Sequence, residues 1–560
     1  MRSVILLILS LINSFFLFSQ TNYCDTILPA YKNKTTIYNS NGHQLMTQDN
    51  FRICLKDTVY YQIKFIDLIG SQESPVEIVL EGDTAAISSD APYYGLKFDN
   101  CHFIKLSGKK RNSDERGLRI ENINGIGITV DKLSSDFEIE KIHIENVKQV
   151  GIMVKTDPDC SFAATRDSFL LQNLSIHHNL IRKTGTEAMY IGHTFYDGYT
   201  INCDGKDTMV LPHLLENVRI YDNITDSTGW DGIQVSSSIS PCEIYNNKIT
   251  NDSYAEYYGQ MSGIQLGRGS ICNCFNNIVS SGYGNGIEIH SRGNIKVYNN
   301  LLIRPGQKFK PGLQGSYSIA GIYVSYNLTN PGNTPYFFIN NSIISPKSDG
   351  IRFANVNSDN NQFINNIILN PGTYEYYLQN HLDPETSYIH MDADVPTDEL
   401  NNIKTLVSND LKFVNEQKDD FHIQTGSTAY NTGFNVALYG INYDLDSNVR
   451  PVHEFYDIGA YEYQPGQLIK ENIESNFKIL QIKYISEKEI WVKFENRNSN
   501  LISFELYTAT GSRLTVSLPY IYSEGVHEVL IPVTRSGIGV VLLRVNSGGK
   551  ISTVKIPIIK

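Results

Sequence analysis

Short apolar runs that end in Asn recur through the middle of the chain. Seven segments share this ending, at Asn179, Asn223, Asn247, Asn277, Asn300, Asn341 and Asn366. In a second series a small residue precedes alternating apolar and polar positions, and its members begin at Ala188, Gly232, Gly263, Gly286, Gly321 and Gly350. Alternation over so few residues, without helical spacing of the apolar positions, predicts β-strands rather than helices.

The two series keep a phase of nine residues in four coils, and two coils carry longer insertions. Nine residues lead from Asn179 to Ala188, and the same interval separates Asn223 from Gly232. A basic coil therefore holds about 23 residues with at least two short strands, which predicts a parallel β-helix. Leucine-rich repeats would need a Leu-rich consensus, and propellers would need longer blades. The recurring Asn side chains are expected to stack and to hydrogen-bond from coil to coil.

Over residues 85–380, this coil pattern resembles the right-handed parallel β-helix repeat family. That family includes pectin and alginate lyases, polygalacturonases, epimerases, phage tailspikes and surface adhesins. The resemblance implies an all-β, right-handed solenoid. Segment 457–463, after segment 411–415, is similar to the closing segment of many secreted bacterial members. We therefore expect a C-terminal cap over residues 381–463, and an N-terminal cap with the first coils over residues 20–84.

The N-terminal segment has the pattern of a secretory signal peptide. Arg2 precedes an apolar run that continues to Phe18, and the small residue Ser19 follows. The run is too short to span a bilayer comfortably; an uncleaved membrane anchor is the alternative. Residues 1–19 are thus predicted to be removed during export. Because no later segment is long and apolar enough to cross a membrane, no transmembrane segment is expected afterwards.

Residues 476–560 differ from the coils in charge and pattern. After a polar linker over 464–475, they carry 11 Lys and Arg against 6 Glu and no Asp. Their short alternating strands predict a small β-sandwich. Segments 507–513, 539–545, 548–550 and 555–560 resemble the C-terminal sorting domain of the type IX secretion system, although Val541 stands where members usually carry an aromatic residue.

That resemblance implies passage across a bacterial outer membrane with the type IX secretion machinery as a partner. The product would then be released or anchored on the cell surface. An ordinary carbohydrate-binding or immunoglobulin-like module is the alternative, because these modules share the sandwich architecture.

Composition narrows the choice of partner. With 47 Lys and Arg against 59 Asp and Glu, the formal net charge is −12. A general nucleic-acid binder needs a basic surface to replace phosphate counterions, so no nucleic acid is expected as a partner. Hydrophobic residues make up 41% of the chain, which is enough to form a buried core. We expect a monomer.

All eight cysteines lie in the first half of the chain. Cys242, Cys272 and Cys274 fall at inward strand positions, so they are predicted to be stacked core residues rather than metal ligands. Export permits disulfides, for which Cys24–Cys54 and Cys160–Cys203 are the preferred pairs.

In the second series, side chains alternate between the interior and the exterior. Ile233 and Val235 are expected to point inward, so Gln234 points outward. The same parity gives one outward residue per coil, in an exposed column formed by Tyr190, Gln234, Gln265, Glu288, Tyr323 and Arg352. His290 and Arg292 are expected to face outward on the strand of Glu288. Polar and aromatic side chains about 4.8 Å apart fit an extended sugar chain; a solvated sheet face is the alternative.

Glu187 and Asp231 each stand just before the small residue of successive coils. Directly stacked coils would bring their carboxylates to roughly 5 Å, near the separation in a retaining glycosidase. The pair could instead hold Ca²⁺, the one cofactor considered, with Asn285 or Ser262. Its parity matches the inward residues, so capping of a turn through bonds to backbone N–H groups is a third interpretation.

Two other polar features are assigned no chemistry. His193 and His213 are predicted to be loop residues. Segment 383–399 holds six carboxylates and no Lys or Arg. It lacks the spacing of a calcium-binding loop, so a solvated loop is predicted.

Two reactions compete for the outward column. A β-eliminating lyase needs a base, for which His290 or Tyr190 is the candidate. It also needs a cation at the uronate carboxylate, supplied by Arg292, Arg268 or Ca²⁺. A hydrolase would use the two carboxylates of Glu187 and Asp231 as acid and base.

The motifs of polygalacturonases and of alginate and chondroitin lyases are absent from the chain. We nevertheless expect a secreted or cell-surface protein that binds an extracellular polysaccharide and cleaves it, with a lyase favoured over a hydrolase. A non-catalytic adhesin or structural β-helix protein is the alternative.

Overall fold

The structure, a computed structural model, describes residues 23–557 apart from 44–50, 91, 310–318, 327–333, 373–387, 393, 465–476, 487–488, 497–499, 509–512, 518–519, 534–539 and 548–549. It divides into two compact units, Met1–Tyr463 and Gln464–Lys560. The predicted signal peptide, nearly all of the predicted linker, and residues 509–512 and 548–549 of the segments that resemble a sorting domain lie outside the described residues.

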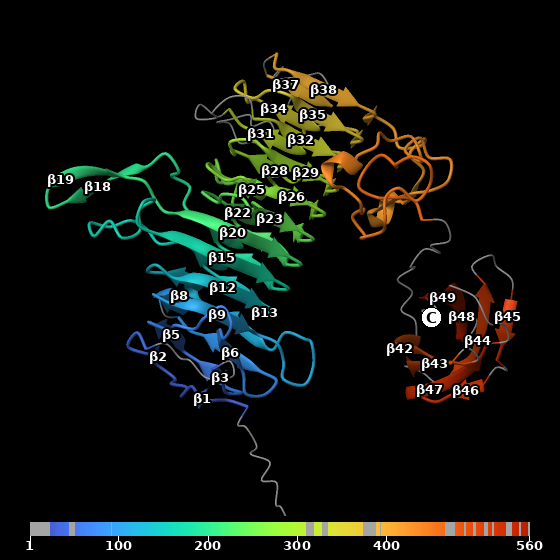
Figure 1. The fold of residues 1–560 in the computed structure, drawn as a ribbon, viewed down its shortest axis with the longest axis horizontal. Coiled ribbons are helices and arrows are strands. Elements are labelled where there is room, and N and C mark those ends of the chain that lie inside the picture. Colours follow the sequence, from blue (N-terminus) through green and yellow to red (C-terminus); the bar gives the residue numbers. More distant parts are fainter. Residues whose placement is uncertain are drawn as a thin grey trace, which may run out of the picture. The chain divides into compact units, whose positions relative to one another are not determined.

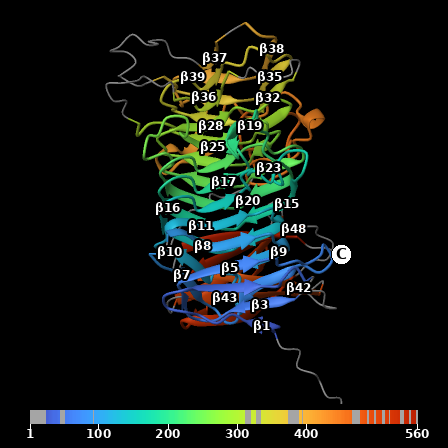
Figure 2. The ribbon, with the colours of Figure 1, turned by 90° about the vertical axis from the view of Figure 1, so that its left-hand side faces the viewer.

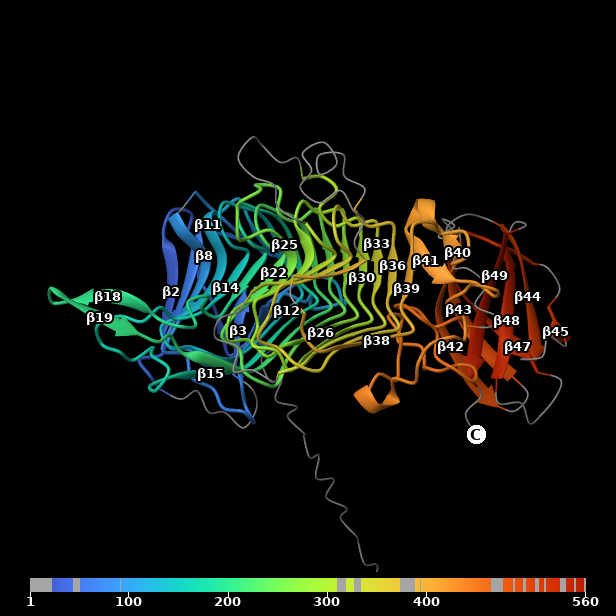
Figure 3. The same ribbon diagram turned by 90° about the horizontal axis from the view of Figure 1, so that it is seen from above.

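The first unit is a right-handed parallel β-helix (Figure 1), as predicted. Each complete coil contributes one strand to each of three long parallel sheets, which we call A, C and B in their order along a complete coil. The coils follow one another in sequence order along the stack (Figure 3). Sequence analysis identified the strands of sheets A and B, and the third strand of each coil belongs to sheet C.

Sheet A has thirteen strands. They are β1 (Thr26–Ile27), β3 (Arg52–Leu55), β6 (Val76–Leu80), β9 (His102–Ser107), β12 (Ser135–Glu140), β15 (Leu170–His177), β20 (Leu214–Tyr221), β23 (Cys242–Tyr245), β26 (Asn273–Phe275), β29 (Ile295–Tyr298), β32 (Tyr336–Ile339), β35 (Asn361–Ile364) and β38 (Thr397–Leu400).

Sheet C has twelve strands. They are β4 (Val59–Tyr60), β7 (Ala85–Ser88), β10 (Leu118–Glu121), β13 (Ile142–Val147), β16 (Leu180–Thr184), β21 (Ile224–Thr228), β24 (Lys248–Thr250), β27 (Ile278–Ser280), β30 (Leu301–Ile303), β33 (Ser342–Ile344), β36 (Ile367–Leu369) and β39 (Ile403–Thr405).

Sheet B also has twelve strands. They are β2 (Thr35–Asn39), β5 (Gln62–Ile66), β8 (Pro92–Asp99), β11 (Asn124–Asp131), β14 (Ile152–Val154), β17 (Met189–Ile191), β22 (Ile233–Val235), β25 (Ser262–Leu266), β28 (Asn285–Ile289), β31 (Ile322–Val324), β34 (Ile351–Phe353) and β37 (Ile389–Met391). Figure 2 looks onto this sheet.

Buried Asn residues stack at the corner between sheets A and C. The Oδ1 atom of each accepts bonds from the backbone N–H and the Nδ2 of the Asn one coil earlier, as Asn247 does from Asn223 at 3.1 and 3.0 Å. The ladder comprises Asn179, Asn223, Asn247, Asn277, Asn300, Asn341, Asn366 and Asn402. The predicted coil-to-coil hydrogen bonding is confirmed.

The residue before each ladder Asn turns the chain. Asn246 and Asn276 have a φ of 54°, in the left-handed region. Asn tolerates this region better than most residues because its short side chain bonds to nearby backbone. In an Asn-Asn pair, the first residue therefore makes the corner and the second bonds to the next coil.

The small residues of the second series lie at the corner between sheets C and B. A Cβ atom on Gly232 would lie 2.5 Å from the carbonyl oxygen of Gly263 and 2.7 Å from Cγ2 of Ile249. On Gly286 it would lie 2.5 Å from the carbonyl oxygen of Gly321. Close approach of successive coils therefore explains the glycines.

The solenoid interior is a continuous apolar core that includes Cys242, Cys272 and Cys274, as predicted. Cys242 and Cys272 are also joined by a disulfide, which was not predicted. Both preferred pairs, Cys24–Cys54 and Cys160–Cys203, are confirmed.

The coils extend past residue 380, where the cap was expected to begin, because β38 and β39 still join sheets A and C. Segment 383–399 was predicted to be a solvated loop, but its described part contributes β37 and the start of β38. All four residues of β38 are exposed, so this strand lacks the alternation of apolar and polar positions that identifies the other strands.

The cap that follows holds the antiparallel pair β40 (Phe413–Asn415) and β41 (Asp420–Ile423), with short 3-10 helices η1 (Glu416–Lys418) and η2 (Ala437–Tyr439). It contacts the coils directly, since Nδ2 of Asn340 donates to the carbonyl oxygen of Asp457 at 2.9 Å. Inside the cap, the fully buried Arg450 donates to the same carbonyl and pairs with Glu462 at 3.3 Å.

The second unit consists of two antiparallel sheets around a separate apolar core. One sheet contains β42 (Phe477–Ser486), β43 (Glu489–Asn496) and β47 (Gly525–Pro532). The other contains β44 (Asn500–Thr508), β45 (Arg513–Val516), β46 (Tyr520–Tyr522), β48 (Val540–Ser547) and β49 (Lys550–Pro557). This is the predicted small β-sandwich. Across the part of the chain that the structure describes, no helix has the length and apolarity that a membrane crossing requires.

Candidate functional site

The outward side chains of strands β5 to β37 of sheet B form one continuous column, which we call the sheet B column. Figure 2 looks onto these strands. Neighbouring strands pair in register along its whole length. Its members are Lys64, Lys97, Thr129, Met153, Tyr190, Gln234, Gln265, Glu288, Tyr323, Arg352 and His390. The six residues predicted to align are consecutive members.

The predicted exposure of these six residues is wrong for the central three. Gln234, Gln265 and Glu288 are 0%, 3% and 7% exposed. Nε2 of Gln234 donates to Oε1 of Gln265 at 3.0 Å, and Nε2 of Gln265 donates to the carbonyl oxygen of Gly259 at 3.3 Å. The segment between β24 and β25 therefore contacts the middle of the column, while Tyr190 and Tyr323 stay partly exposed.

Glu288 and His290 form the ionisable centre of the column. Oε1 of Glu288 lies 3.0 Å from Nε2 of His290, whose side chain is 27% exposed. Nδ2 of Asn285 donates to the other carboxylate oxygen at 3.0 Å. Strand β28 ends at Ile289, so His290 and Arg292 lie in the following turn. They had been predicted to lie on the strand itself.

Arg292 and Arg268 bind the segment after β17 instead of facing Glu288. The Arg292 guanidinium donates to the hydroxyl of Tyr196 at 2.8 Å, and Arg268 pairs with Asp197 at 3.4 Å. Arg352 is likewise paired with Asp392, at 3.0 Å. The role of Arg292 and Arg268 as cations beside the base stays a prediction.

Glu187 and Asp231 are both buried at the corner before the column. Oδ1 of Asp231 accepts from the backbone N–H and the Oγ of Ser262 at 2.8 and 2.7 Å, which is the turn-capping arrangement considered from the sequence. Burial raises the pKa of Glu187, and it raises the pKa of Asp231 well above its usual value. The carboxylates of Glu187 and Glu288 raise the pKa of Asp231 further by repulsion.

Three buried oxygen atoms near this corner have no hydrogen-bond partner among the described residues. They are Oδ2 of Asp231, Oε1 of Gln234 and Oε1 of Gln260. Buried polar atoms normally have a partner, so such atoms need an explanation. All three are hard oxygen donors of the kind that Ca²⁺ prefers.

An ionic cluster beside Tyr190 was missed by the sequence analysis. Nζ of Lys155 lies 2.6 Å from Asp157 and 5.3 Å from the centre of the Tyr190 ring. His193, a loop residue as predicted but buried, lies 3.1 Å from Asp157 and stacks on Tyr199. Burial opposes ionisation of Asp157, but His193 and Lys155 outweigh it and hold its pKa below its usual value. In the sequence, only the Lys-x-Asp spacing at 155–157 indicates that these two charged side chains could pair.

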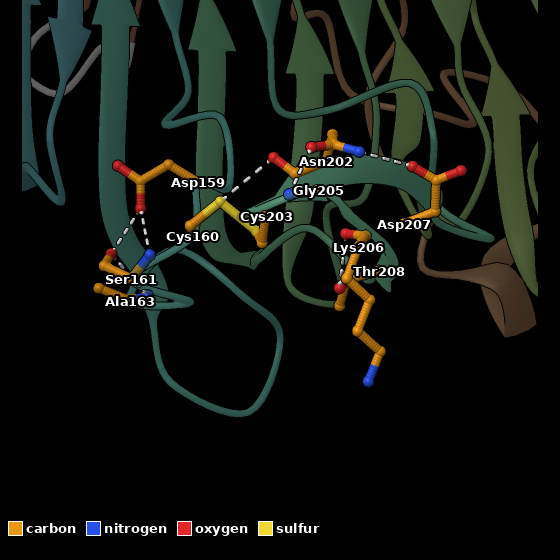
Figure 4. The surroundings of a disulfide bond; sticks show 10 residues. All are labelled: Asp159, Cys160, Ser161, Ala163, Asn202, Cys203, Gly205, Lys206, Asp207 and Thr208. Carbon is orange, nitrogen blue, oxygen red and sulfur yellow. Dashed lines mark hydrogen bonds between the residues drawn. A yellow bond between two sulfur atoms is a disulfide. The ribbon is translucent and has the colours of Figure 1, made fainter.

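A hairpin of β18 (Tyr199–Cys203) and β19 (Lys206–Val210) extends away from the coils beside this cluster (Figures 1 and 3). The Cys160–Cys203 disulfide joins its first strand to the loop before β15 (Figure 4). The two strands of the hairpin pair only with each other in the described sheets. Phe195 and Met209 leave apolar surface exposed here, at 58% and 64%.

We expect replacement of both Cys160 and Cys203 by Ser to free this hairpin. A disulfide stabilises by about 2–4 kcal/mol through restriction of the open chain, and the hairpin has little other strand pairing. Limited proteolysis should then cut within 196–211 at least tenfold faster, while the coils stay intact. Replacing Cys24 and Cys54 instead should leave that cleavage rate unchanged. Equal cleavage of the Cys160/Cys203 variant and the native protein would contradict the expectation.

Asp252 predicts a pH-dependent stability for the segment that contacts the column. Burial raises the pKa of the Asp252 carboxyl from 3.8 to about 6, although the hydrogen bond from Oγ of Ser253 lowers it in part. A carboxyl whose pKa is raised on folding contributes most stability below its unfolded pKa and loses it as pH rises through about 6. Asp252→Asn should therefore stabilise the protein by up to about 3 kcal/mol near pH 8 and little near pH 4. Thermal unfolding across this range tests it; the exposed Asp410→Asn should show no such trend.

A separate ionisable group lies on the outer side of sheet A. Glu138, Glu140 and His177 bring one ligand-type atom each within 4.8 Å of one another. Nζ of Lys105 already lies 2.9 Å from Glu138 and 3.6 Å from Glu140. The hydrogen bond from His177 lowers the pKa of Glu138 to about 2, against the effect of burial. The ammonium and the imidazole thus compensate these carboxylates.

Comparison with models of protein families gives no match, and comparison with curated proteins gives none. Among solved structures, the chain is similar to the alginate lyase from Paenibacillus sp. str. FPU-7, at 14% identity over 61% of this chain and 93% of that one, with a TM-score of 0.35. It is also similar to the periplasmic alginate epimerase AlgG, at 11% identity over 66% and 78%, with a TM-score of 0.26. A third similar structure is the A-module of the Azotobacter vinelandii mannuronan C-5 epimerase AlgE4, at 11% identity over 64% of this chain and 88% of that one, with a TM-score of 0.23. Similarity this distant does not identify a substrate, so a function has to be argued from the sheet B column.

Proposed function

We propose that the sheet B column binds an extracellular uronate polysaccharide and that the protein cleaves it by β-elimination. The observation that carries the proposal is the Glu288–His290 pair, 3.0 Å apart, within an in-register series of hydrogen-bonding and aromatic side chains. At about 4.8 Å per coil, Tyr190 and Tyr323 stand about 19 Å apart with the pair between them. That length suits several units of an extended sugar chain.

In β-elimination, a base takes the proton beside the uronate carboxylate and the glycosidic oxygen leaves from the next carbon. His290 is the base in this proposal, and Glu288 orients its ring and stabilises the imidazolium that forms. Asn285 in turn holds Glu288 through its second oxygen. Tyr190 is the other base considered; its hydroxyl lies 3.1 Å from Oγ1 of Thr194.

Arg292, Arg268 and Ca²⁺ are the candidates for the positive charge at the uronate carboxylate. For Ca²⁺, the unpartnered oxygens of Asp231, Gln234 and Gln260 are donors of the kind it prefers, and when bound it would offset the charge of the substrate carboxylate. Hydrolysis by Glu187 and Asp231 is less favoured, because Asp231 is fully buried and engaged by Ser262.

Export is part of the same proposal. The signal peptide pattern and the sorting-domain resemblance favour secretion by the type IX machinery, which would bring the protein to an extracellular polysaccharide. Three disulfides support an oxidising location. Released and surface-anchored forms both remain consistent with this proposal.

Binding is tested by replacing the two partly exposed tyrosines of the column. Tyr190→Ala and Tyr323→Ala should each weaken binding of a polyuronate by about tenfold, because each removes a ring against which a sugar can pack. Titration calorimetry with the full chain measures this. Arg219→Ala, an exposed change on sheet A, is the matched control and should bind normally. Unchanged affinity in both tyrosine variants would show that the polysaccharide binds elsewhere.

A further inference from the structure

Ser325 completes a chain of three side chains on the sheet B face. It follows β31 directly, one coil beyond His290, because Ile289 and Val324 pair in register. Its Oγ lies 2.5 Å from Nδ1 of His290, while Nε2 of the same ring lies 3.0 Å from Glu288. A hydroxyl, an imidazole and a carboxylate are therefore linked in series.

The hydrogen positions in this series follow from the neighbours. A carboxylate oxygen at 3.0 Å requires a proton on Nε2 of His290. In the neutral ring, Nδ1 then carries the lone pair, and the Ser325 hydroxyl donates to it. The carbonyl oxygen of Ile289 is the second acceptor for this hydroxyl, at 3.3 Å. Nδ2 of Asn285 donates to Oε2 of Glu288, so Asn285 orients the carboxylate, and the carboxylate in turn orients the imidazole of His290.

This is the arrangement in which an imidazole activates a hydroxyl nucleophile. The nucleophile lies within hydrogen-bond distance of the base, and the base is oriented by a third group. β-Elimination does not require a hydroxyl at this position. Ser236 gives the contrast: it occupies the same position three coils before Ser325, but its neighbour toward His290 is Gly267, and its Oγ has no partner among the described residues.

We propose that Ser325, His290 and Glu288 remove ester-linked acyl groups, such as acetyl, from sugar hydroxyls of the bound polysaccharide. The choice of a sugar ester rests on the proposed function, whereas the acyl-transfer chemistry rests on the three side chains alone.

The reaction has two balanced steps. Oγ of Ser325 attacks the ester carbonyl, and its proton passes to Nδ1 of His290. The ester C–O bond then breaks, and the sugar oxygen leaves with that proton, which gives a free sugar hydroxyl and an acyl-serine. Water attacks the acyl-serine with His290 as base, releasing the carboxylic acid and restoring Ser325. Glu288 accepts the hydrogen bond from Nε2–H of His290 and stabilises the imidazolium in both steps.

The test uses the full chain, a fluorophosphonate probe and an O-acetylated polyuronate. We expect the probe to add to Oγ of Ser325, located by peptide mass spectrometry, and acetate to be released. Ser325→Ala should abolish labelling and lower acetate release by about 10³-fold or more. Ser236→Ala should retain both.

Labelling at another residue, or acetate release that Ser325→Ala leaves unchanged, would overturn the proposal, as would the absence of both signals in the native protein. Elimination by the native protein is measured in parallel on the deacetylated polymer. Elimination without acetate release would refute acyl transfer alone. Acetate release without elimination would refute the lyase proposal alone.

Discussion

Glu288→Gln is expected to lower the rate of polyuronate cleavage by about 10²–10⁴-fold. The carboxylate accepts from Nε2–H of His290 at one oxygen and from Nδ2 of Asn285 at the other. A glutamine has only one acceptor oxygen, so its NH₂ group would face a donor at one of the two places. The imidazolium would also lose the negative charge that stabilises it.

His290→Ala is expected to have an effect of the same size, because it removes the base itself. The rate of formation of unsaturated uronate measures both variants under saturating substrate. Glu243→Gln changes the same residue type on the outward side of sheet A and should cleave normally. If the Glu288 and His290 variants both cleave at the native rate, the site has been assigned wrongly.

The second large effect is expected inside the Asn ladder. Asn277→Ala removes bonds in both directions, since Oδ1 of Asn277 accepts from the backbone and side chain of Asn247 at 3.0 Å each. Its Nδ2 donates to Oδ1 of Asn300 in the next coil at 3.1 Å and to the carbonyl oxygen of Ile244 at 2.9 Å. Each buried group left without a partner costs about 1–3 kcal/mol, so a loss of about 3–5 kcal/mol is expected.

Unfolding of a solenoid need not be two-state, so the measurement should be local. Hydrogen exchange of backbone amides in β23, β26 and β29 should accelerate strongly in the Asn277 variant. Asn276→Gly is the control, because Asn276 has a φ of 54° and glycine accepts that conformation. Equal protection of these strands in the Asn277 variant and the native protein would contradict the assigned role of the ladder.

The coil architecture could be predicted because its cause is periodic. The constant interval from Asn179 to Ala188 reports the distance between two corners, and each corner has a steric or hydrogen-bonding requirement that only a few residue types satisfy. The register of the sheet B column followed from that phase, so the alignment from Tyr190 to Arg352 was predictable in full.

What covers the column could not be predicted, because it depends on insertions with no periodicity. The segment that holds Gly259 contacts Gln265 from outside, and this contact buries residues whose parity predicted exposure. The same holds for Lys155, which reaches Tyr190 from another coil, and for Arg292, which is drawn away by Tyr196. Strand parity gives the direction of a side chain, but loop contacts decide which partner it meets.

The Cys242–Cys272 bridge was missed for a related reason. Two inward positions stacked on successive coils can hold free thiols or a disulfide, and the pattern of apolar positions is the same for both. Cys274, two residues after Cys272, shows the other outcome, because it is buried and unbridged.

The most direct test of the central claim is the incubation of the full chain with neutral and uronate polysaccharides, with Ca²⁺ or with a chelator. Reducing ends and unsaturated uronate absorbance should be followed together. The account predicts that both signals rise on a polyuronate and fall when Ca²⁺ is removed. Reducing ends without unsaturated product would mean hydrolysis, and silence from the folded protein on every polysaccharide would mean a binding protein without this chemistry; either result would contradict the account.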